Sequence, residues 1–255
     1  MFALSTASVY PDDVSRGFDY AARLGYDAVE VMVSIDSLSQ SPRQVKKLSE
    51  YYEMPVCAVH APCLLITQRV WGTDPWIKLE RSAEMARDLG ADVVVVHPPF
   101  RWQREYAEAF VNGIADLERR TGIAFAVENM YPWRATGRDL QMYAPNWDPT
   151  ADGYRNMTLD VSHASTARMD SLELAKRMDA SLRHLHLTDG LGSPRDEHLI
   201  PGRGSQPVAE LLNHLRDTEF GGHVVVEINT RKAGSKAARE QDLLEALAFA
   251  QLHMG

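Results

Sequence analysis

The sequence predicts an α/β protein built as a single (β/α)8 barrel, the TIM-barrel fold, with eight parallel strands in one domain spanning residues 1–255. Short β-branched runs alternate with longer helical patterns from one end of the chain to the other, which is typical of consecutive βαβ units. Eight such units can be counted, and 255 residues is close to the length of about 250 that one such barrel needs. No low-complexity tract marks a domain boundary.

The expected strands are short apolar runs, and helical patterns fill the segments between them. The strands are expected at Phe2–Ser5, Asp27–Val33, Pro55–His60, Asp92–His97, Ile123–Glu128, Asn156–Asp160, Leu182–Leu187 and His223–Ile228. The helices are expected at Asp13–Leu24, Pro42–Tyr52, Pro75–Leu89, Glu105–Arg119, Leu172–Arg177, Val208–Leu215 and Lys236–Leu252. Gly25, Gly90 and Gly122 stand where three of these helices should end, in positions that favour a left-handed cap residue.

Composition and charge are those of an ordinary globular chain. Hydrophobic residues make up 45% and charged residues 24% of the sequence, which is enough apolar surface for a sizeable core. The net charge of −8 disfavours a nucleic-acid partner, although bound cations can reverse the potential in one cleft. The apolar runs are far shorter than the roughly 20 residues of a membrane span, and the amino terminus lacks a signal-peptide pattern. We therefore expect a cytoplasmic protein without membrane contact.

The carboxyl ends of the expected strands carry an unusual set of residues. Six consecutive strands, the third to the eighth, end in or beside a possible metal ligand: His60, His97, Glu128, Asp160, His186 and Glu227. One such residue alone is most often a hydrogen-bonded structural group. Barrel strands converge at this face, so these side chains are expected to share one small volume. Carboxylates crowded there would raise each other's pKa, and bound cations remove that conflict.

Three more residues extend this set. His163 follows Asp160 by three residues, so a turn after the strand can bring both groups to one centre. Asp196 and His198 are two residues apart, and in extended backbone such a pair projects to the same side. Mixed imidazole and carboxylate ligands suit Zn²⁺ or Mn²⁺ better than magnesium or calcium. Nine ligands exceed the need of one ion, so we expect one to three divalent ions per chain.

The motifs around these residues resemble a known superfamily. They are His60-Ala61-Pro62, His97-Pro98, Val127-Glu128-Asn129, Asp160 with His163, His186-Leu187-Thr188-Asp189, Asp196-Glu197-His198 with Pro201-Gly202-Arg203-Gly204, and Val226-Glu227. In this order, over nearly the whole chain, they resemble the xylose isomerase-like barrels (AP endonuclease family 2), the group that unites endonuclease IV with sugar-phosphate isomerases and epimerases.

The resemblance implies one of two chemistries. In isomerase-like members, positions matching Glu128, Asp160, His186 and Glu227 hold one manganese or similar ion, and the two glutamates shuttle a proton beside the substrate carbonyl. In endonuclease IV-like members, matching positions hold a trinuclear zinc cluster that cleaves phosphodiesters at abasic sites. The full nine-ligand set favours the hydrolase, because a one-metal isomerase has no obvious need for His60, Asp196 and His198 together.

Other residues favour a small substrate over DNA. The first strand reads Leu4-Ser5-Thr6-Ala7-Ser8 and lacks the Gly-x-His-x-Ser pattern of endonuclease IV, and Cys63 stands where that family usually has a DNA-wedging tyrosine. We therefore place a metal-dependent isomerase or epimerase of a sugar or sugar phosphate, with Glu128 and Glu227 as the acid and base, ahead of an AP endonuclease. A third reading, a barrel that only binds metal or a partner, predicts that Glu128→Gln or Glu227→Gln leaves function intact.

Two long connections, Met130 to Tyr154 and Thr188 to Pro207, are expected to wall the site. Trp133 is a candidate roof for a small pocket, and Arg134 and Arg203 are candidate phosphate clamps because a guanidinium matches phosphate oxygens in bidentate fashion. On composition alone, each arginine is more often a solvated surface residue. Glu30, which ends the second strand, is expected either to face the cleft or to form a salt bridge.

Overall fold

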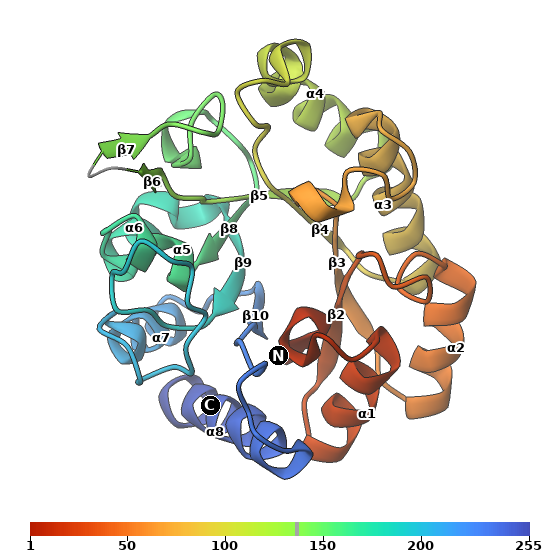
Figure 1. The fold of residues 1–255 in the computed structure, drawn as a ribbon, viewed down its shortest axis with the longest axis vertical. Helices are drawn as coiled ribbons and strands as arrows, with labels where there is room; N and C mark the ends of the chain where they lie inside the picture. The colour runs from red at the N-terminus through yellow and green to blue at the C-terminus, as the bar shows by residue number, and fades with distance from the viewer. Residues whose placement is uncertain (136–137) are drawn as a thin grey trace.

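The computed structural model describes residues 1–135 and 138–255, and it contains the closed parallel barrel predicted from the sequence (Figure 1). The strands pair in the order β1-β10-β9-β8-β5-β4-β3-β2. They are β1 (Phe2–Ser5), β2 (Ala28–Met32), β3 (Val56–His60), β4 (Val93–Val96), β5 (Ala124–Glu128), β8 (Met157–Asp160), β9 (Leu182–Leu187) and β10 (His223–Val226). The predicted fold class is confirmed, and each predicted strand lies within two residues of its observed bounds.

The described residues form eight α-helices, and most of them surround the barrel (Figure 1). They are α1 (Val14–Leu24), α2 (Pro42–Tyr52), α3 (Pro75–Leu89), α4 (Arg104–Thr121), α5 (Val161–Thr166), α6 (Ser171–Met178), α7 (Val208–Asp217) and α8 (Lys236–Met254). Gly25, Gly90 and Gly122 cap α1, α3 and α4 with φ of 85°, 76° and 72°, as their positions predict. Over residues 1–135 and 138–255, no helix combines the length and apolar character needed to cross a bilayer.

The chain departs from a regular barrel in two places that the sequence patterns did not reveal. In the described part of the connection from β5 to β8, an antiparallel hairpin of β6 (Trp133–Ala135) and β7 (Arg138–Leu140) takes the place of a crossover helix. The prolines of this connection disfavour a helix interior, since each would remove a hydrogen bond. Immediately after β8, the short helix α5 begins with Asp160 as its N-cap, because the carboxylate accepts a hydrogen bond from His163 N.

The barrel interior changes character along its axis, and this change positions the functional residues. Alternate residues of a strand face the same side, so Ala124, Ala126 and Glu128 of β5 follow one another along the interior. Val95 of β4 likewise faces the interior, and it is followed on that side by His97, which lies just after the end of the strand. Small apolar side chains thus fill the amino-terminal end, and titratable side chains collect at the carboxyl-terminal end, where barrel enzymes carry their sites.

At the opposite end, one ion-pair network ties distant strands together. Asp92, just before β4, accepts a hydrogen bond of 2.7 Å from His223 Nε2 on β10 and pairs with Arg183 on β9. Neither strand is a neighbour of β4 in the sheet, so the network spans the bottom of the barrel. The hydrogen bond from His223, reinforced by Arg183, lowers the pKa of Asp92 to about 2 although burial opposes the shift.

Asp92→Asn is expected to lower the free energy of unfolding by about 1 kcal/mol at pH 7, a modest value because the carboxylate is half exposed. A depressed folded-state pKa stabilises the fold above the usual value of 3.8, and this contribution is lost as pH falls towards 2. Denaturant unfolding should therefore show a shallower pH dependence between 4 and 2 in the variant, and Asp88→Asn on the exposed side of α3 should leave it unchanged. Equal slopes for wild type and Asp92→Asn would contradict this role.

Candidate metal centre

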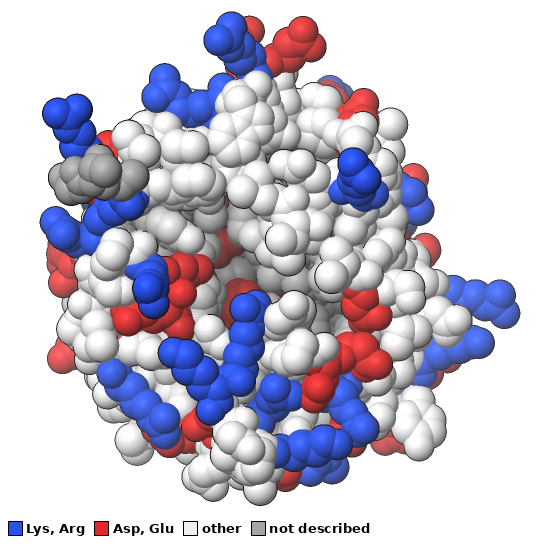
Figure 2. All heavy atoms as spheres, in the orientation of Figure 1, with Lys and Arg blue, Asp and Glu red and all other residues white. Residues whose placement is uncertain are grey.

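A cavity of about 320 Å³ opens at the carboxyl-terminal face of the barrel. Figure 2 shows this hollow at the centre of the face, with acidic side chains visible inside it. Seven of the nine predicted ligands line the cavity, namely His60, His97, Glu128, His163, Asp196, His198 and Glu227. The other two, Asp160 and His186, are fully buried and contact this set.

Glu128, at the end of β5, lies at the centre of the cluster. Its Oε2 is 2.9 Å from His97 Nε2 and 3.4 Å from His60 Nε2. Its Oε1 is 3.1 Å from His186 Nδ1 and 3.2 Å from His163 Nδ1. One carboxylate therefore contacts four imidazoles that come from four different parts of the barrel, which is the convergence that the strand ends predict.

His186, on β9, connects the cluster to the barrel interior. Its Nδ1 lies 2.9 Å from Glu227 Oε2 and 3.6 Å from Asp160 Oδ2, while its Nε2 lies 3.2 Å from Glu30 Oε2. The same Glu30 oxygen is 2.8 Å from His184 Nε2. Glu30 thus pairs with two buried histidines beneath the cavity, and it holds the His186 ring so that Nδ1 faces the other carboxylates.

Asp196 joins the remaining two histidines from the long loop after β9. Its Oδ2 lies 3.0 Å from His198 Nε2 and 3.2 Å from His163 Nε2, and its Oδ1 accepts a hydrogen bond of 2.6 Å from the Ser162 hydroxyl. Asp196 and His198 do meet, but extended backbone is not the reason, because His198 has φ of 46°. A left-handed residue bends the loop back so that the pair converges.

The two glutamates of the cluster, Glu128 and Glu227, are held in their charged forms. Burial opposes ionisation of Glu128, but the charge of His186, with hydrogen bonds from His163 and His186, keeps its pKa well below the usual range. Burial likewise opposes ionisation of Glu227, and the charge of His186 lowers its pKa. Both glutamates are therefore ionised, and able to accept a proton, at neutral pH.

The histidines divide into two groups. Burial lowers the pKa of His97, although Glu128 opposes the shift, so this ring is neutral at pH 7 and can offer a nitrogen lone pair. Burial also acts against charge on His198, but the charge of Asp196 outweighs it and raises the pKa of His198 to about 10. A protonated ring such as that of His198 supplies positive charge among the carboxylates.

The donor set fits divalent metal ions. Glu128 Oε2 and Asp160 Oδ2 are buried carboxylate oxygens that accept no hydrogen bond of good geometry from the described residues, although His97 Nε2 lies 2.9 Å from Glu128 Oε2. Such an arrangement is costly unless a cation is present. His60 and His198 each direct Nδ1 at a backbone carbonyl oxygen, at 3.0 Å and 2.7 Å, which leaves Nε2 to face the cluster. Three groups in the cluster have ligand atoms within 4.8 Å of one another: His60, His97 and Glu128; Glu128, Asp160 and His186; and Asp160, His163 and His198.

The structure places Arg203, the expected phosphate clamp, away from the residues that line the cavity. Its guanidinium pairs with two carboxylates of α8, with Nε 2.8 Å from Glu245 Oε1 and Nη1 3.6 Å from Asp242 Oδ1. Oppositely charged groups on the neighbouring helix therefore direct the side chain outward.

Trp133 and Arg134 also lie outside the cavity walls. Arg134 donates hydrogen bonds to the carbonyl oxygens of Thr166 and Gly192, so it braces the loop after β9 against α5. Trp133 packs in a small apolar cluster with Phe100, which follows β4, and with residues of its own β5–β8 connection. Both residues therefore contact and support the loops around the cavity, and neither lines the cavity itself.

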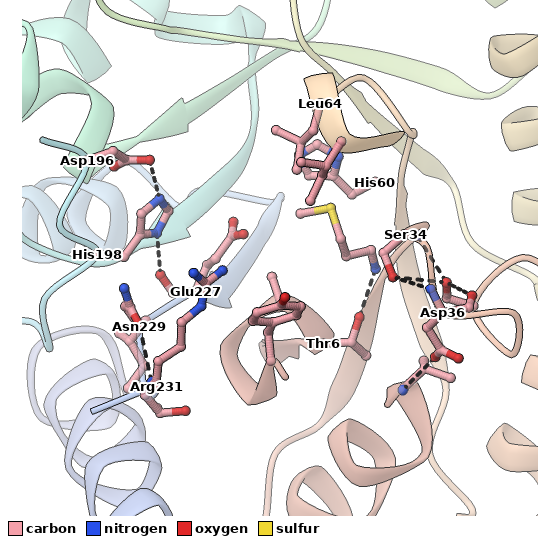
Figure 3. A pocket seen from close by; sticks show the side chains of 18 of the residues that line it. Thr6, Ser34, Asp36, His60, Leu64, Asp196, His198, Glu227, Asn229 and Arg231 are labelled. Atoms are coloured by element: carbon pink, nitrogen blue, oxygen red, sulfur yellow. Dashed lines mark hydrogen bonds and ion pairs between the residues drawn. The ribbon is translucent and has the colours of Figure 1, made fainter. Parts of the chain in front are cut away.

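Sequence reasoning missed several cavity residues in short loops. Thr6 follows β1, Ser34 follows β2, and Asn229 and Arg231 follow β10 (Figure 3). Tyr10, which also lines the cavity, follows β1 as well. The available signal was position alone, since each follows the carboxyl end of a barrel strand, as do the ligands.

The Asn129 side chain contacts Asp160, one of the expected metal ligands. Its side-chain amide donates to Asp160 O at 3.0 Å, and its Oδ1 accepts from Asp160 N at 2.7 Å. Asp189 accepts hydrogen bonds from the backbone of Gly202, Gly204 and Gln206 and shapes the loop after β9.

Comparison with known proteins agrees with the fold. A family model described as xylose isomerase-like TIM barrel matches residues 18–251. An uncharacterized protein of Mycobacterium tuberculosis is 50% identical over 270 residues, which cover 98% of this chain and 96% of that protein. Fructoselysine 3-epimerase of Escherichia coli O157:H7 is 20% identical over 242 residues, 85% of this chain and 86% of that enzyme.

Solved structures share the fold at low sequence identity. A D-tagatose 3-epimerase-like protein superposes with a TM-score of 0.70 at 22% identity, covering 100% of this chain and 99% of that one. The 3-keto-D-glucoside 4-epimerase of E. coli gives a TM-score of 0.72 at 18% identity, covering 98% of each chain.

Proposed function

Because the chain belongs to the xylose isomerase-like TIM-barrel family, we propose that it is a metal-dependent isomerase or epimerase of a sugar or a sugar derivative, with Glu128 and Glu227 as its acid and base. The observation that carries the proposal is that both glutamates contact the same atom, His186 Nδ1, at 3.1 Å and 2.9 Å, on the wall of one cavity. Relatives named as epimerases of sugars and sugar conjugates support the substrate class.

The reaction needs a proton to leave a carbon beside a carbonyl and a proton to return. Glu128 is fixed to β5 and Glu227 follows β10, so the two carboxylates approach the cavity from different strands. Both are ionised, so either can remove the proton. The other glutamate takes a proton from water and returns it to the substrate from its own side, and the first glutamate then releases its proton to water. Return to the opposite face of the carbon inverts it, and transfer to the neighbouring carbon moves the carbonyl.

The other buried groups hold this arrangement. Glu128, Asp160, His186 and Glu227 would hold the ion on this proposal, and a bound divalent cation would polarise the substrate carbonyl and hydroxyl as a Lewis acid. Glu30 fixes the orientation of His186 from below, and Asn129 fixes the backbone of Asp160. The cavity of about 320 Å³ lies at the small end of the range for ligand pockets, as a monosaccharide or its derivative requires.

The proposal is tested with purified protein loaded with Mn²⁺ or Zn²⁺. Ketoses, ketose phosphates and sugar conjugates are incubated in D₂O and followed by NMR, which detects both epimer formation and uptake of deuterium at the exchanging carbon. We expect turnover of at least one sugar class, its loss after chelation, and its recovery on reloading. Nicking of an abasic-site duplex by catalytic amounts of protein, without exchange in any sugar, would overturn the proposal.

A second candidate function is phosphodiester hydrolysis. Three ligand groups rather than one favour it, because His60, Asp196 and His198 lie outside the set that a single ion needs. On this alternative, Glu128 and Asp160 each belong to two of the groups and would bridge ions, and DNA would be the substrate. The same assay separates the two functions, since hydrolysis exchanges no carbon-bound hydrogen.

A further inference from the structure

Arg231 is the single Lys or Arg side chain among the described residues that line the cavity. It follows β10, four residues after Glu227, and in Figure 3 its side chain runs from this loop towards Glu227. Its guanidinium forms no salt bridge with any residue in the ranges 1–135 and 138–255. Instead, the guanidinium carbon lies 4.2 Å from the centre of the Tyr10 ring.

The acidic groups around the cavity already have other partners. Asp12 pairs with Arg239 at 2.6 Å, and Asp36 accepts hydrogen bonds of 3.0 Å from the backbone of Val14 and Leu38. The remaining carboxylates on the wall face the histidines of the metal centre. The positive charge of Arg231 is therefore the one that the cavity leaves without a counter-charge among the described residues.

The backbone around Arg231 is anchored before any ligand arrives. Ile228 N donates to the Ser8 hydroxyl at 3.0 Å, the buried Thr230 hydroxyl donates to Ser8 O, and Arg231 N donates to Asn229 Oδ1 at 3.2 Å. These bonds join the loop after β10 to the turn after β1, which also carries Tyr10. The contact between these two loops therefore positions both the Arg231 guanidinium and the Tyr10 ring. Because both side chains are held in place beforehand, a ligand loses less free energy in ordering them when it binds.

We propose that the substrate carries an oxyanion, a phosphate or a carboxylate, and that Arg231 binds this group at the cavity mouth while the sugar carbonyl lies at the metal centre. This rests on the proposed function and specifies its substrate class. A guanidinium presents paired N–H donors that match two oxygens of either anion, and stacking on Tyr10 leaves those donors unused by any residue that the structure describes. A neutral sugar would leave this charge unpaired.

Three ligands that differ at one carbon test the inference: D-fructose, D-fructose 6-phosphate and D-fructuronate. Their affinities for metal-loaded protein are measured by calorimetry, at low and at high salt, beside the turnover assay. We expect at least one anionic ligand to bind 10-fold or more tightly than fructose, with a preference that shrinks at high salt. Arg231→Gln should abolish the preference, Arg231→Lys should restore part of it, and Arg203→Gln, away from the cavity, should leave it intact.

The outcomes separate this inference from the proposed function. Equal affinity for all three ligands, or a preference that survives Arg231→Gln, overturns the role of Arg231, while sugar turnover would still uphold the isomerase or epimerase. A preference for only one of the two anions supports the inference and identifies the group. Absence of binding and turnover for every sugar overturns the proposed function and, with it, this inference.

Discussion

Replacing Glu128 with glutamine is expected to lower kcat by about 10³-fold, within the range of 10²–10⁴ that general acid–base groups contribute. Glutamine keeps the shape of the side chain and one acceptor oxygen, but it cannot accept a proton from carbon. The substitution also removes the negative charge that faces His60, His97, His163 and His186, so metal content must be measured beside turnover. Loss of kcat in protein that still holds metal assigns the proton transfer to Glu128.

Glu118→Gln is a matched control, because Glu118 contacts β5, the strand that carries Glu128, near its opposite end. Glu118 is a half-buried glutamate of α4 whose Oε1 accepts hydrogen bonds from Phe125 N on β5, at 3.1 Å, and from Asn156, at 2.6 Å. Glutamine can keep those bonds, so turnover should stay within about twofold of wild type while the general cost of a Glu-to-Gln change near β5 is measured.

Glu227→Gln gives a second and more specific comparison. If two bases work from opposite sides of the carbon, each variant should lose net epimerisation but still exchange deuterium into one of the two epimers, and the two variants should exchange opposite ones. Turnover within tenfold of wild type in either variant would show that the glutamate in question is not an essential base, and it would favour the hydrolytic or the purely binding alternative.

Much of the fold and of the candidate site could be predicted because two periodic rules act together. Alternation along a strand puts Ala124, Ala126 and Glu128 on one side, and a closed parallel barrel turns that side inward for every strand at once. Residues as distant in sequence as His60 and Glu227 therefore reach one cavity without any knowledge of the loops between them. The prediction of nine metal ligands depended mainly on these two rules, and the structure brings all nine expected residues together.

The remaining features depend on loop backbone, for which no such period exists. Arg203 was chosen as a substrate contact and Arg231 was not, yet Arg203 faces carboxylates 39 and 42 positions further along the chain, and Arg231 lines the cavity. The φ of 46° at His198, which directs its ring to Asp196, is equally invisible to a pattern. The contacts of Glu30 in the core could not be predicted from a pattern either. Its salt bridges with His184 and His186 depend on the register between β2 and the rest of the barrel.

Removing metal is expected to destabilise the protein strongly, and restoring it should raise the Tm by about 5 °C or more. A ligand at 100 times its Kd stabilises the native state by about 2.7 kcal/mol, and each kcal/mol corresponds to about 2–4 °C for a domain of this size. The physical reason is the pair of buried oxygens, Glu128 Oε2 and Asp160 Oδ2, which accept no hydrogen bond of good geometry from the described residues. Calorimetric melting of chelated protein, with and without added Zn²⁺ or Mn²⁺, measures the shift.

Asp160→Asn separates metal binding from folding. Asn caps a helix about as well as Asp, so the variant can keep the hydrogen bond from His163 N that starts α5 and lose only the charge at Oδ2. We expect its metal-free Tm to stay close to that of wild type and its response to metal to fall sharply. Asp170→Asn, at the exposed N-cap of α6, is the matched control and should keep the full response. A metal response in Asp160→Asn equal to that of wild type would refute ligation by this residue.

The number of ions bound at saturation then distinguishes the two enzymatic chemistries. One ion per chain, unaffected in number by His97→Gln, fits the group of Glu128, Asp160 and His186 and the proton-transfer reaction. Three ions, reduced to two by His97→Gln, mean that the group of His60, His97 and Glu128 is a separate site, as phosphodiester hydrolysis across several ions requires. His97 is a sharp probe because, unlike Glu128, it belongs to that group alone.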